Sequence, residues 1–232
     1  MELDGLFLDM YGTLTTGDRA AVEGVCAALV RDLDLPLPAA EFAVLWGNRF
    51  FALLDTLTPE RFLTLYEAER ESLISTLADF GRQADPDPYI AQLAGYWRDP
   101  PLQPETRRFL AEFPRPICIV SNADRVDLEL ALARHDIRVD RVVTSDDVRS
   151  YKPDRRIFDE ALGLTGWRRD RVLHVGDSLH SDVLGAARAG LRSAWVNRAH
   201  RIHDIGTHPP DYELPDLDAL THLVRNSHGT PQ

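Results

Sequence analysis

The sequence contains almost no lysine. Of its 26 basic residues, Lys152 is the single lysine, and all the others are arginines. Lysine carries a compact ammonium group on a thin stem, whereas arginine ends in a wide planar fork. The isolated lysine therefore points either to a position that arginine cannot fill or to chance, and composition leaves both open.

Cysteine is also scarce. Cys26 and Cys118 are the two cysteines among 232 residues, and both lie in apolar stretches of sequence. We expect two buried free thiols in a reducing compartment rather than a disulfide, and hence a cytoplasmic protein.

Excess positive charge and long apolar runs are absent as well. The formal net charge is −11 at pH 7, which argues against non-specific nucleic-acid binding because that requires a basic face. No apolar run approaches membrane-spanning length, so we expect no membrane insertion and no secretion. A local cation would still let this acidic chain bind a small anionic substrate. The chain would act as a monomer or a homodimer, and the sequence leaves both open.

Two different spacings of apolar residues divide the chain into two parts. Residues 16–98 carry apolar side chains at three- and four-residue spacing, which predicts a helical bundle, with one helix beginning after Thr58 at Pro59. Residues 1–15 and 99–232 alternate short apolar strands with helices, which is typical of a parallel sheet covered on both faces. We therefore predict an α/β fold, with a doubly wound, Rossmann-like core and an inserted all-helical domain.

Polar residues stand where the predicted strands end. Asp9 ends the first strand, Ser121 and Asn122 end the second, and Asp177 ends a later one. Because the carboxyl ends of parallel strands share one edge of a sheet, we expect these side chains to meet there. Each acid also has a simpler explanation, since Asp9 can begin a turn and Asp177 or Ser178 can cap a helix.

The charges of this group indicate its chemistry. Asp9, Asp177 and Asp182 would place three carboxylates in one small volume, which is costly unless a divalent cation neutralises them. Hard oxygen ligands favour Mg²⁺. Ser121 and Lys152 would add a hydroxyl donor and a positive charge, which suit an anionic substrate.

Four motifs in this order resemble those of the haloacid dehalogenase superfamily of hydrolases. The resemblance covers nearly the whole chain and implies that the helical insert is the cap domain of that family. The motifs are, in chain order, Asp9-Met10-Tyr11-Gly12-Thr13-Leu14, Ile119-Val120-Ser121-Asn122, Lys152-Pro153, and Gly176-Asp177 through Asp182.

The resemblance also implies a role for each motif residue. Asp9 would be the nucleophile, forming a covalent ester that water then hydrolyses. Ser121 would hold the transferring group, and Lys152 would neutralise Asp9 and the substrate. Asp177 would bind Mg²⁺, with Asp182 either a further ligand or an orienting residue.

Tyr11 departs from the phosphatase pattern of the superfamily, in which an aspartate at this position donates a proton to the leaving alcohol. Asp-x-Tyr-Gly-Thr is typical of the dehalogenase branch, because a halide leaves unprotonated. Three features oppose dehalogenation: Asp177 belongs to the phosphatase form of the fourth motif, Phe158 replaces a tyrosine of the dehalogenases, and Trp46 is not followed by their substrate-binding arginine. Arg49 is the nearest substitute.

From these features we predict Mg²⁺-dependent hydrolysis of a small phosphorylated metabolite through an aspartyl-phosphate on Asp9. Tyr11 would offer its main-chain carbonyl to the metal and its hydroxyl as a weak acid, unless the leaving group needs none. The alternatives are a 2-haloacid dehalogenase that forms its ester on the same Asp9, and a non-catalytic binding protein with this fold. The residues expected to contact substrate are Thr13, Asn122, Trp46 and Arg49.

Overall fold

A computed structural model describes residues 2–202 and 208–226 of the chain. The contacts between residues divide it into two compact units. The α/β unit comprises the described residues of 1–16, 101–122 and 137–232, and the helical unit comprises residues 17–100 and 123–136.

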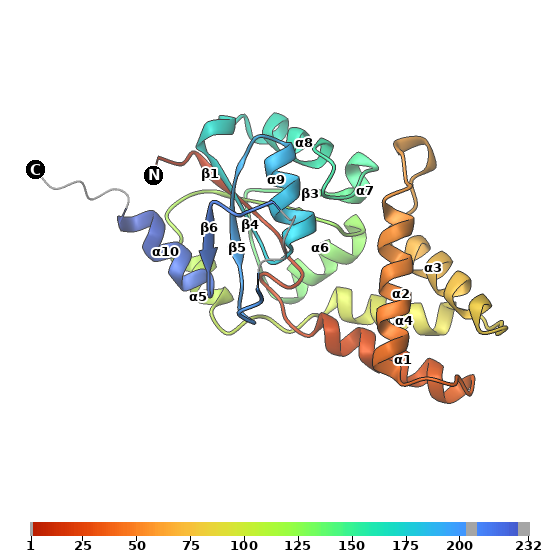
Figure 1. Cartoon of the computed structure of the whole chain (residues 1–232). Coiled ribbons are helices and arrows are strands. Elements are labelled where there is room, and N and C mark those ends of the chain that lie inside the picture. The colour runs from red at the N-terminus through yellow and green to blue at the C-terminus, as the bar shows by residue number, and fades with distance from the viewer. Residues whose placement is uncertain (1, 203–207, 227–232) are drawn as a thin grey trace, which may run out of the picture. The chain divides into compact units, whose positions relative to one another are not determined.

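The α/β unit is built on one six-stranded sheet in which every strand pairing is parallel. The strand order is β3-β2-β1-β4-β5-β6 (Figure 1), so the chain leaves β1 on one side and returns to its other side. This arrangement confirms the predicted doubly wound α/β fold. The strands are β1 (Gly5–Leu8), β2 (Ile117–Ser121), β3 (Arg141–Thr144), β4 (Val172–Gly176), β5 (Arg192–Val196) and β6 (Tyr212–Leu214).

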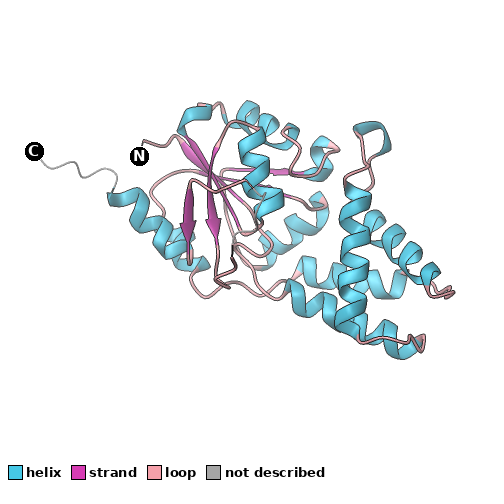
Figure 2. Ribbon diagram, viewed as in Figure 1, coloured by secondary structure: helices cyan, strands magenta, loops and turns pink. Residues whose placement is uncertain are grey.

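Helices pack on this sheet, as Figure 2 shows. Helix α8 covers β2 and β3, where Phe158 packs with Phe7 and Val120 in a fully buried cluster. The helices are α5 (Thr106–Glu112), α7 (Ser145–Val148), α8 (Arg156–Thr165), α9 (Gly185–Arg188) and α10 (Leu217–Asn226), with short helical turns η2 (Arg169–Arg171) and η3 (Leu179–Leu184).

The helical unit holds no strand among its residues. Helix α2 packs against α1 and α3, and α4 packs against α1. Trp46 of α2 is buried, and its indole N–H donates to Ser72 Oγ of α3 at 2.9 Å. The helices are α1 (Asp18–Asp32), α2 (Ala39–Leu54), α3 (Leu65–Asp79), α4 (Asp87–Arg98) and α6 (Arg125–Arg134), with the turn η1 (Pro59–Arg61).

Helix α6 follows β2 in the chain, yet it groups with the helical unit. It packs against α4, and Arg98 of α4 forms an ion pair with Asp127 of α6 at 2.6 Å. The predicted helical domain, residues 16–98, does not include this segment, because a helix between two strands is usually a crossover that belongs to the α/β core.

The third helix of the insert begins later than the sequence analysis predicted. Pro59 opens only the short turn η1, and α3 starts at Leu65. Thr64 and Glu67 form a reciprocal capping box at its start, and the Asp124 carboxylate accepts the N–H of Leu65 at 2.6 Å. The predicted start was wrong because the capping box supplies more of the partners that a helix start needs than a proline does.

Cys26 and Cys118 are both buried, and neither forms a disulfide, as predicted. Burial raises the pKa of the Cys26 thiol to about 12, so this group stays protonated. Within the described ranges, no helix combines the length and the apolar character needed to cross a lipid bilayer.

Candidate active site

The polar residues at the strand ends meet at one edge of the sheet. Asp9 directly follows β1, Ser121 is the last residue of β2, and Asp177 directly follows β4. Ser121 Oγ donates to Asp9 Oδ1 at 3.1 Å, and Lys152 Nζ donates to the same oxygen at 2.7 Å. Three chain segments thus converge on one buried carboxylate, as expected for the carboxyl edge of a parallel sheet.

Lys152 is enclosed by three oxygen acceptors. Its Nζ lies 2.7 Å from Asp9 Oδ1, 2.6 Å from Asp182 Oδ1 and 3.0 Å from the carbonyl of Val120. These three acceptors match the three hydrogens of an ammonium group. Burial disfavours the charged amine, but Asp182 and Asp9 outweigh it and hold the pKa of Lys152 above its usual value. The side chain is therefore a fixed positive charge.

Asp182 is fully engaged by its neighbours. Its Oδ1 contacts Lys152 Nζ and lies 2.9 Å from His174 Nε2, and its Oδ2 accepts the N–H of Ser178 at 3.0 Å. Burial favours the neutral acid, but Lys152 and His174 hold the pKa of Asp182 below its usual range. Asp182 therefore remains ionised and orients Lys152.

His174 was not predicted as part of this site. It is fully buried on β4, and burial lowers the pKa of its imidazole, so the ring is neutral. Its Nδ1 has no hydrogen-bond partner among the residues that the structure describes. The available signal was a single polar residue inside the apolar strand Val172–Gly176.

The carboxylate of Asp9 has one oxygen that these donors leave uncovered. Both donors named above, Ser121 Oγ and Lys152 Nζ, act on Oδ1, so a nucleophilic attack by Asp9 would come from Oδ2. Burial raises the pKa of Asp9, and the adjacent Lys152 opposes that rise. The ammonium thus favours the ionised form that nucleophilic attack requires.

Asp177 completes a cluster of three acids. Asp9, Asp177 and Asp182 each place a carboxylate oxygen within 4.8 Å of the others. The main-chain carbonyl of Asp177 accepts the indole N–H of Trp195 at 2.9 Å and a hydrogen bond from Arg201. When all three acids are ionised, the cluster carries three negative charges against the single positive charge of Lys152.

An arginine donates hydrogen bonds to the main chain of the turn after β1. Arg198 donates to the carbonyls of Gly12 at 3.2 Å and Thr13 at 3.0 Å, and to Glu105 Oε1 at 2.6 Å. The Thr13 hydroxyl is buried and has no hydrogen-bond partner within the described part of the chain. Arg198 was not predicted as part of the site, because an arginine after a strand has no distinguishing pattern.

The other residues predicted to bind substrate have varied surroundings. The Asn122 side chain bonds the main chain of Lys152 in both directions, accepting its N–H at 2.7 Å and donating to its carbonyl at 3.1 Å. Asn122 therefore positions the lysine. Trp46 and Arg49 belong to α2 of the helical unit, where Arg49 bonds Ser75 Oγ at 2.7 Å. For these three residues, and for the half-buried Tyr11, contact with substrate remains a prediction.

Gly12 provides a test of how Asp177 is placed. It has a φ of +85°, and a Cβ at this position would lie 2.6 Å from Asp177 Oδ1. We expect Gly12→Ala to cost about 1–2 kcal/mol of unfolding free energy from the backbone alone and, in addition, to displace Asp177 and lower activity. Denaturant titration and steady-state kinetics measure the two effects separately.

Gly166→Ala is the matched control. Its φ is +69°, and a Cβ there meets no atom within 4 Å. It should lose similar stability and keep its activity. Equal activity in the two variants would show that Asp177 does not depend on the space at Gly12.

Known proteins resemble this chain along most of its length. The model of the haloacid dehalogenase-like hydrolases matches residues 3–190. The chain belongs to this hydrolase family. An (S)-2-haloacid dehalogenase of Pseudomonas sp. (strain YL) is 26% identical over 233 residues, covering 98% of this chain and 97% of that protein.

Two further similar proteins differ in name from the first. The pyrimidine 5'-nucleotidase YjjG of Escherichia coli is 40% identical over 111 residues, covering 47% of this chain and 49% of its own length. The putative hydrolase YfnB of Bacillus subtilis, solved with bound magnesium, superposes with a TM-score of 0.79 at 20% identity, covering 97% of this chain and 100% of its own. The last comparison supports the fold alone.

Proposed function

We propose that this hydrolase cleaves small phosphate monoesters through a covalent ester on Asp9, with Mg²⁺ as cofactor. The observation that carries the proposal is Asp177, whose carboxylate shares one small volume with those of Asp9 and Asp182. A third acid beside the nucleophile would repel an anionic substrate unless a cation lies between them.

The donor set of this cluster fits Mg²⁺. Its oxygens are hard ligands, and its excess of two negative charges equals the charge of the ion. Asp9, Asp177 and the main-chain carbonyl of Tyr11 would hold the metal. Asp182 is engaged by Lys152, His174 and Ser178, so we assign it an orienting role rather than the ligand role. The bound ion would supply charge neutralisation for the phosphoryl group.

The proposed reaction has two steps. Asp9 Oδ2 attacks phosphorus, and the bond between phosphorus and the leaving oxygen breaks. Lys152 Nζ and the Ser121 hydroxyl would then shift their hydrogen bonds from Asp9 Oδ1 to the phosphoryl oxygens. Water then attacks phosphorus, the bond between Asp9 and phosphorus breaks, and inorganic phosphate leaves with Asp9 again a carboxylate. Thr13, whose buried hydroxyl is unpaired within the described residues, would donate a further hydrogen bond to the phosphoryl group.

Tyr11 restricts the leaving groups that this mechanism can serve. Tyrosine titrates near 10, so its hydroxyl is a weaker acid than the aspartate usual at this position. We therefore expect aryl and acyl phosphates, whose leaving groups depart unprotonated, to react faster than alkyl phosphates. Similar rates for the two classes, unchanged in Tyr11→Phe, would refute this role.

The second candidate is a 2-haloacid dehalogenase. The relatives in the comparisons that span the whole chain favour it, and Tyr11 is consistent with it. In that reaction Asp9 Oδ2 attacks the carbon that bears the halogen, halide leaves, and water hydrolyses the resulting carboxylic ester. No acid and no metal are required.

One panel separates the candidates. Wild type and Asp177→Asn would be assayed for phosphate release from an aryl and an alkyl phosphate and for halide release from 2-chloropropionate, each with Mg²⁺ or with chelator. We expect Mg²⁺-dependent phosphate release that Asp177→Asn abolishes, together with calorimetric Mg²⁺ binding that the same variant weakens. Metal-independent halide release that survives in Asp177→Asn would establish the dehalogenase instead. Tight vanadate binding without any turnover would indicate a non-catalytic protein.

A further inference from the structure

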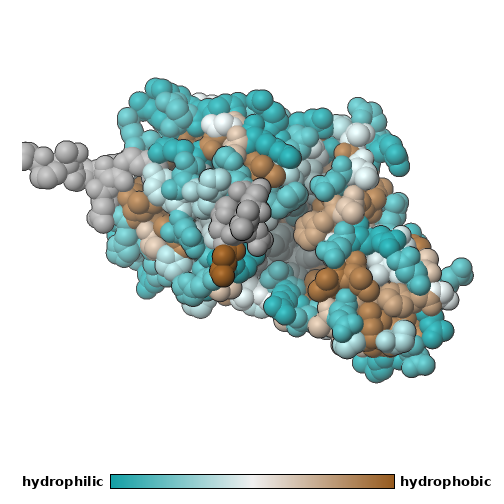
Figure 3. Space-filling view, viewed as in Figure 1, coloured by the Kyte–Doolittle hydropathy of each residue, from teal (hydrophilic) through white to brown (hydrophobic). Residues whose placement is uncertain are grey.

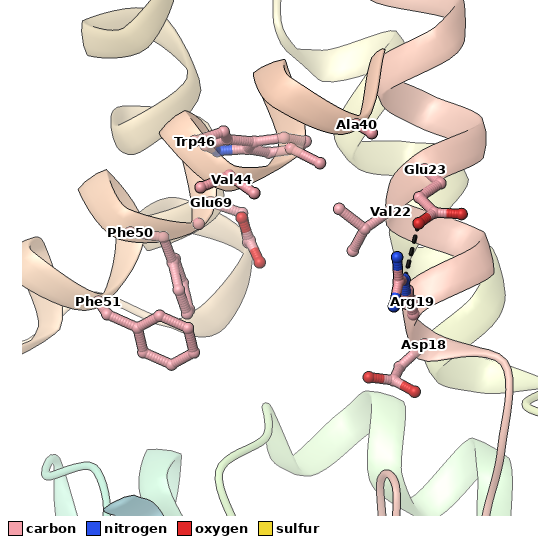
Figure 4. Close-up of a pocket in the computed structure, with 12 residues that line it drawn as sticks. Asp18, Arg19, Val22, Glu23, Ala40, Val44, Trp46, Phe50, Phe51 and Glu69 are labelled. Carbon is pink, nitrogen blue, oxygen red and sulfur yellow. Dashed lines mark hydrogen bonds and ion pairs between the residues drawn. The ribbon is translucent and has the colours of Figure 1, made fainter. Parts of the chain in front are cut away.

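The helical unit contains a cavity whose lining includes Trp46 and none of the residues that act on phosphorus in the proposed reaction. Its volume is about 540 Å³, and helices α1, α2 and α3 line it, as Figure 4 shows. This size is typical of small-molecule pockets. The hydrophobic side chains of the lining are Val22, Val44, Trp46, Phe50 and Phe51.

Aromatic rings form one wall of this cavity. Phe50 and Phe51 pack edge to face with their centroids 5.4 Å apart, and the Trp46 indole is held in place by its hydrogen bond to Ser72. Figure 3 shows hydrophobic side chains gathered at the surface of the helical unit, and Val44 and Phe51 are 62% and 54% exposed. The Phe51 side of the aromatic wall is therefore exposed to solvent, whereas Trp46 and Phe50 form its buried part.

One carboxyl group lies beside the rings of this aromatic wall. Figure 4 shows the Glu69 carboxyl between Trp46 and Phe50. Burial raises the pKa of Glu69 to about 8, so the group is largely neutral at pH 7 when nothing balances its charge. A cation placed beside it would restore the carboxylate and release one proton.

The remaining charged groups of the cavity add further negative charge. Asp18, Arg19 and Glu23 of α1 line the opposite side. Arg19 Nε is already paired with Glu23 at 2.7 Å, and the buried Cys26 thiol on the same helix is neutral. With Glu69 ionised, the cavity has three carboxylates and one guanidinium.

We propose that this cavity binds an organic ammonium cation, with Glu69 as its counter-ion and the rings of Trp46 and Phe50 as its walls. Ammonium groups bind well over aromatic faces within about 6 Å of the ring centre. A metal ion that gave up its bound water would find few replacement ligands here, because the walls are mostly carbon. An anion would be repelled by the carboxylates. The contacts that support the proposal all lie within the helical unit, and cation binding is measured without turnover, so its test does not depend on the reaction at Asp9.

The test compares choline with 3,3-dimethylbutan-1-ol, which has the same shape and a carbon in place of the charged nitrogen. Titration calorimetry on the full chain should show choline binding at least about tenfold more tightly than the alcohol, consistent with cation–π and ion-pair recognition. The choline affinity should rise by about tenfold per pH unit up to pH 8 and then level off, with one proton released at pH 7. Equal affinity for the two probes, or no saturable choline binding, would overturn the proposal.

Two glutamates on one helix provide the matched variants. Glu69→Gln should lose the preference for choline and its pH dependence. Glu71→Gln removes the same charge from an exposed position of α3 and should leave both unchanged. Phe51→Leu, at an exposed position, should weaken choline binding several-fold without affecting folding. Choline binding that persists in Glu69→Gln, or that Glu71→Gln reduces equally, would exclude this site.

Discussion

Asp9→Asn should lower kcat at least about a thousandfold for any substrate that the wild type hydrolyses. In the proposed reaction the attacking atom is Oδ2 of Asp9, the oxygen that Ser121 and Lys152 leave uncovered. The amide has nearly the same shape and cannot form the ester. The measurement is steady-state turnover, with thermal unfolding to show that the variant remains folded.

Ser121→Ala is the comparison variant for this prediction. It removes one hydrogen bond of 3.1 Å to Asp9 Oδ1 and keeps the nucleophile, so we expect a loss of about ten- to a hundredfold. If Asp9→Asn were no more damaging than Ser121→Ala, Asp9 would not be the nucleophile.

A single turnover in ¹⁸O-labelled water then locates the hydrolytic step. Attack of water on phosphorus places the label in the released phosphate, whereas attack on a carboxylic ester places it in Asp9. Peptide mass analysis of the Asp9 segment distinguishes these outcomes.

Lys152→Met and Lys152→Arg should both abolish turnover. Methionine leaves the carboxylates of Asp9 and Asp182 buried without a positive charge, and removing one partner of a buried ion pair costs about 3–5 kcal/mol of stability. Arginine keeps the charge, but its planar fork cannot enter a space in which three acceptors lie within 3.0 Å of one nitrogen. Kinetics and denaturant unfolding measure the two losses.

Arg155→Met is the control for the loss of a cation. Arg155 lies three residues further on and forms an exposed pair with Asp159, so its removal should cost no more than about 0.5 kcal/mol. An active Lys152→Arg variant would show that the lysine is retained by chance rather than for its shape.

Much of the site could be predicted because it follows from topology. Asp9, Ser121 and Asp177 each end a strand that reads as a short apolar run, and parallel strands bring such ends together. Lys152 was recognisable by its rarity and its motif. The contacts now give a physical reason for that rarity, since Nζ fits among three close acceptors.

The missed features depend on contacts that no short pattern records. His174 looks like one polar interruption of a strand until Asp182 is seen beside it, and Arg198 acts through carbonyl groups, which every residue has. Helix α6 groups with α4 because of packing along its length. The substrate class could not be predicted because it depends on the shape of the pocket, whereas the convergence of side chains at Asp9 depends on strand order.

The single lysine also makes this protein simple to observe. A chain grown with ¹⁵N-labelled lysine carries its side-chain label at one position, and that side chain is only 2% exposed, with its ammonium group between two carboxylates. Shielding slows the exchange of its protons with water, so one resonance would report on the centre of the site. Its chemical shift would register the arrival of a ligand or a metal at Asp9 directly, without an assay and without assigning the rest of the spectrum.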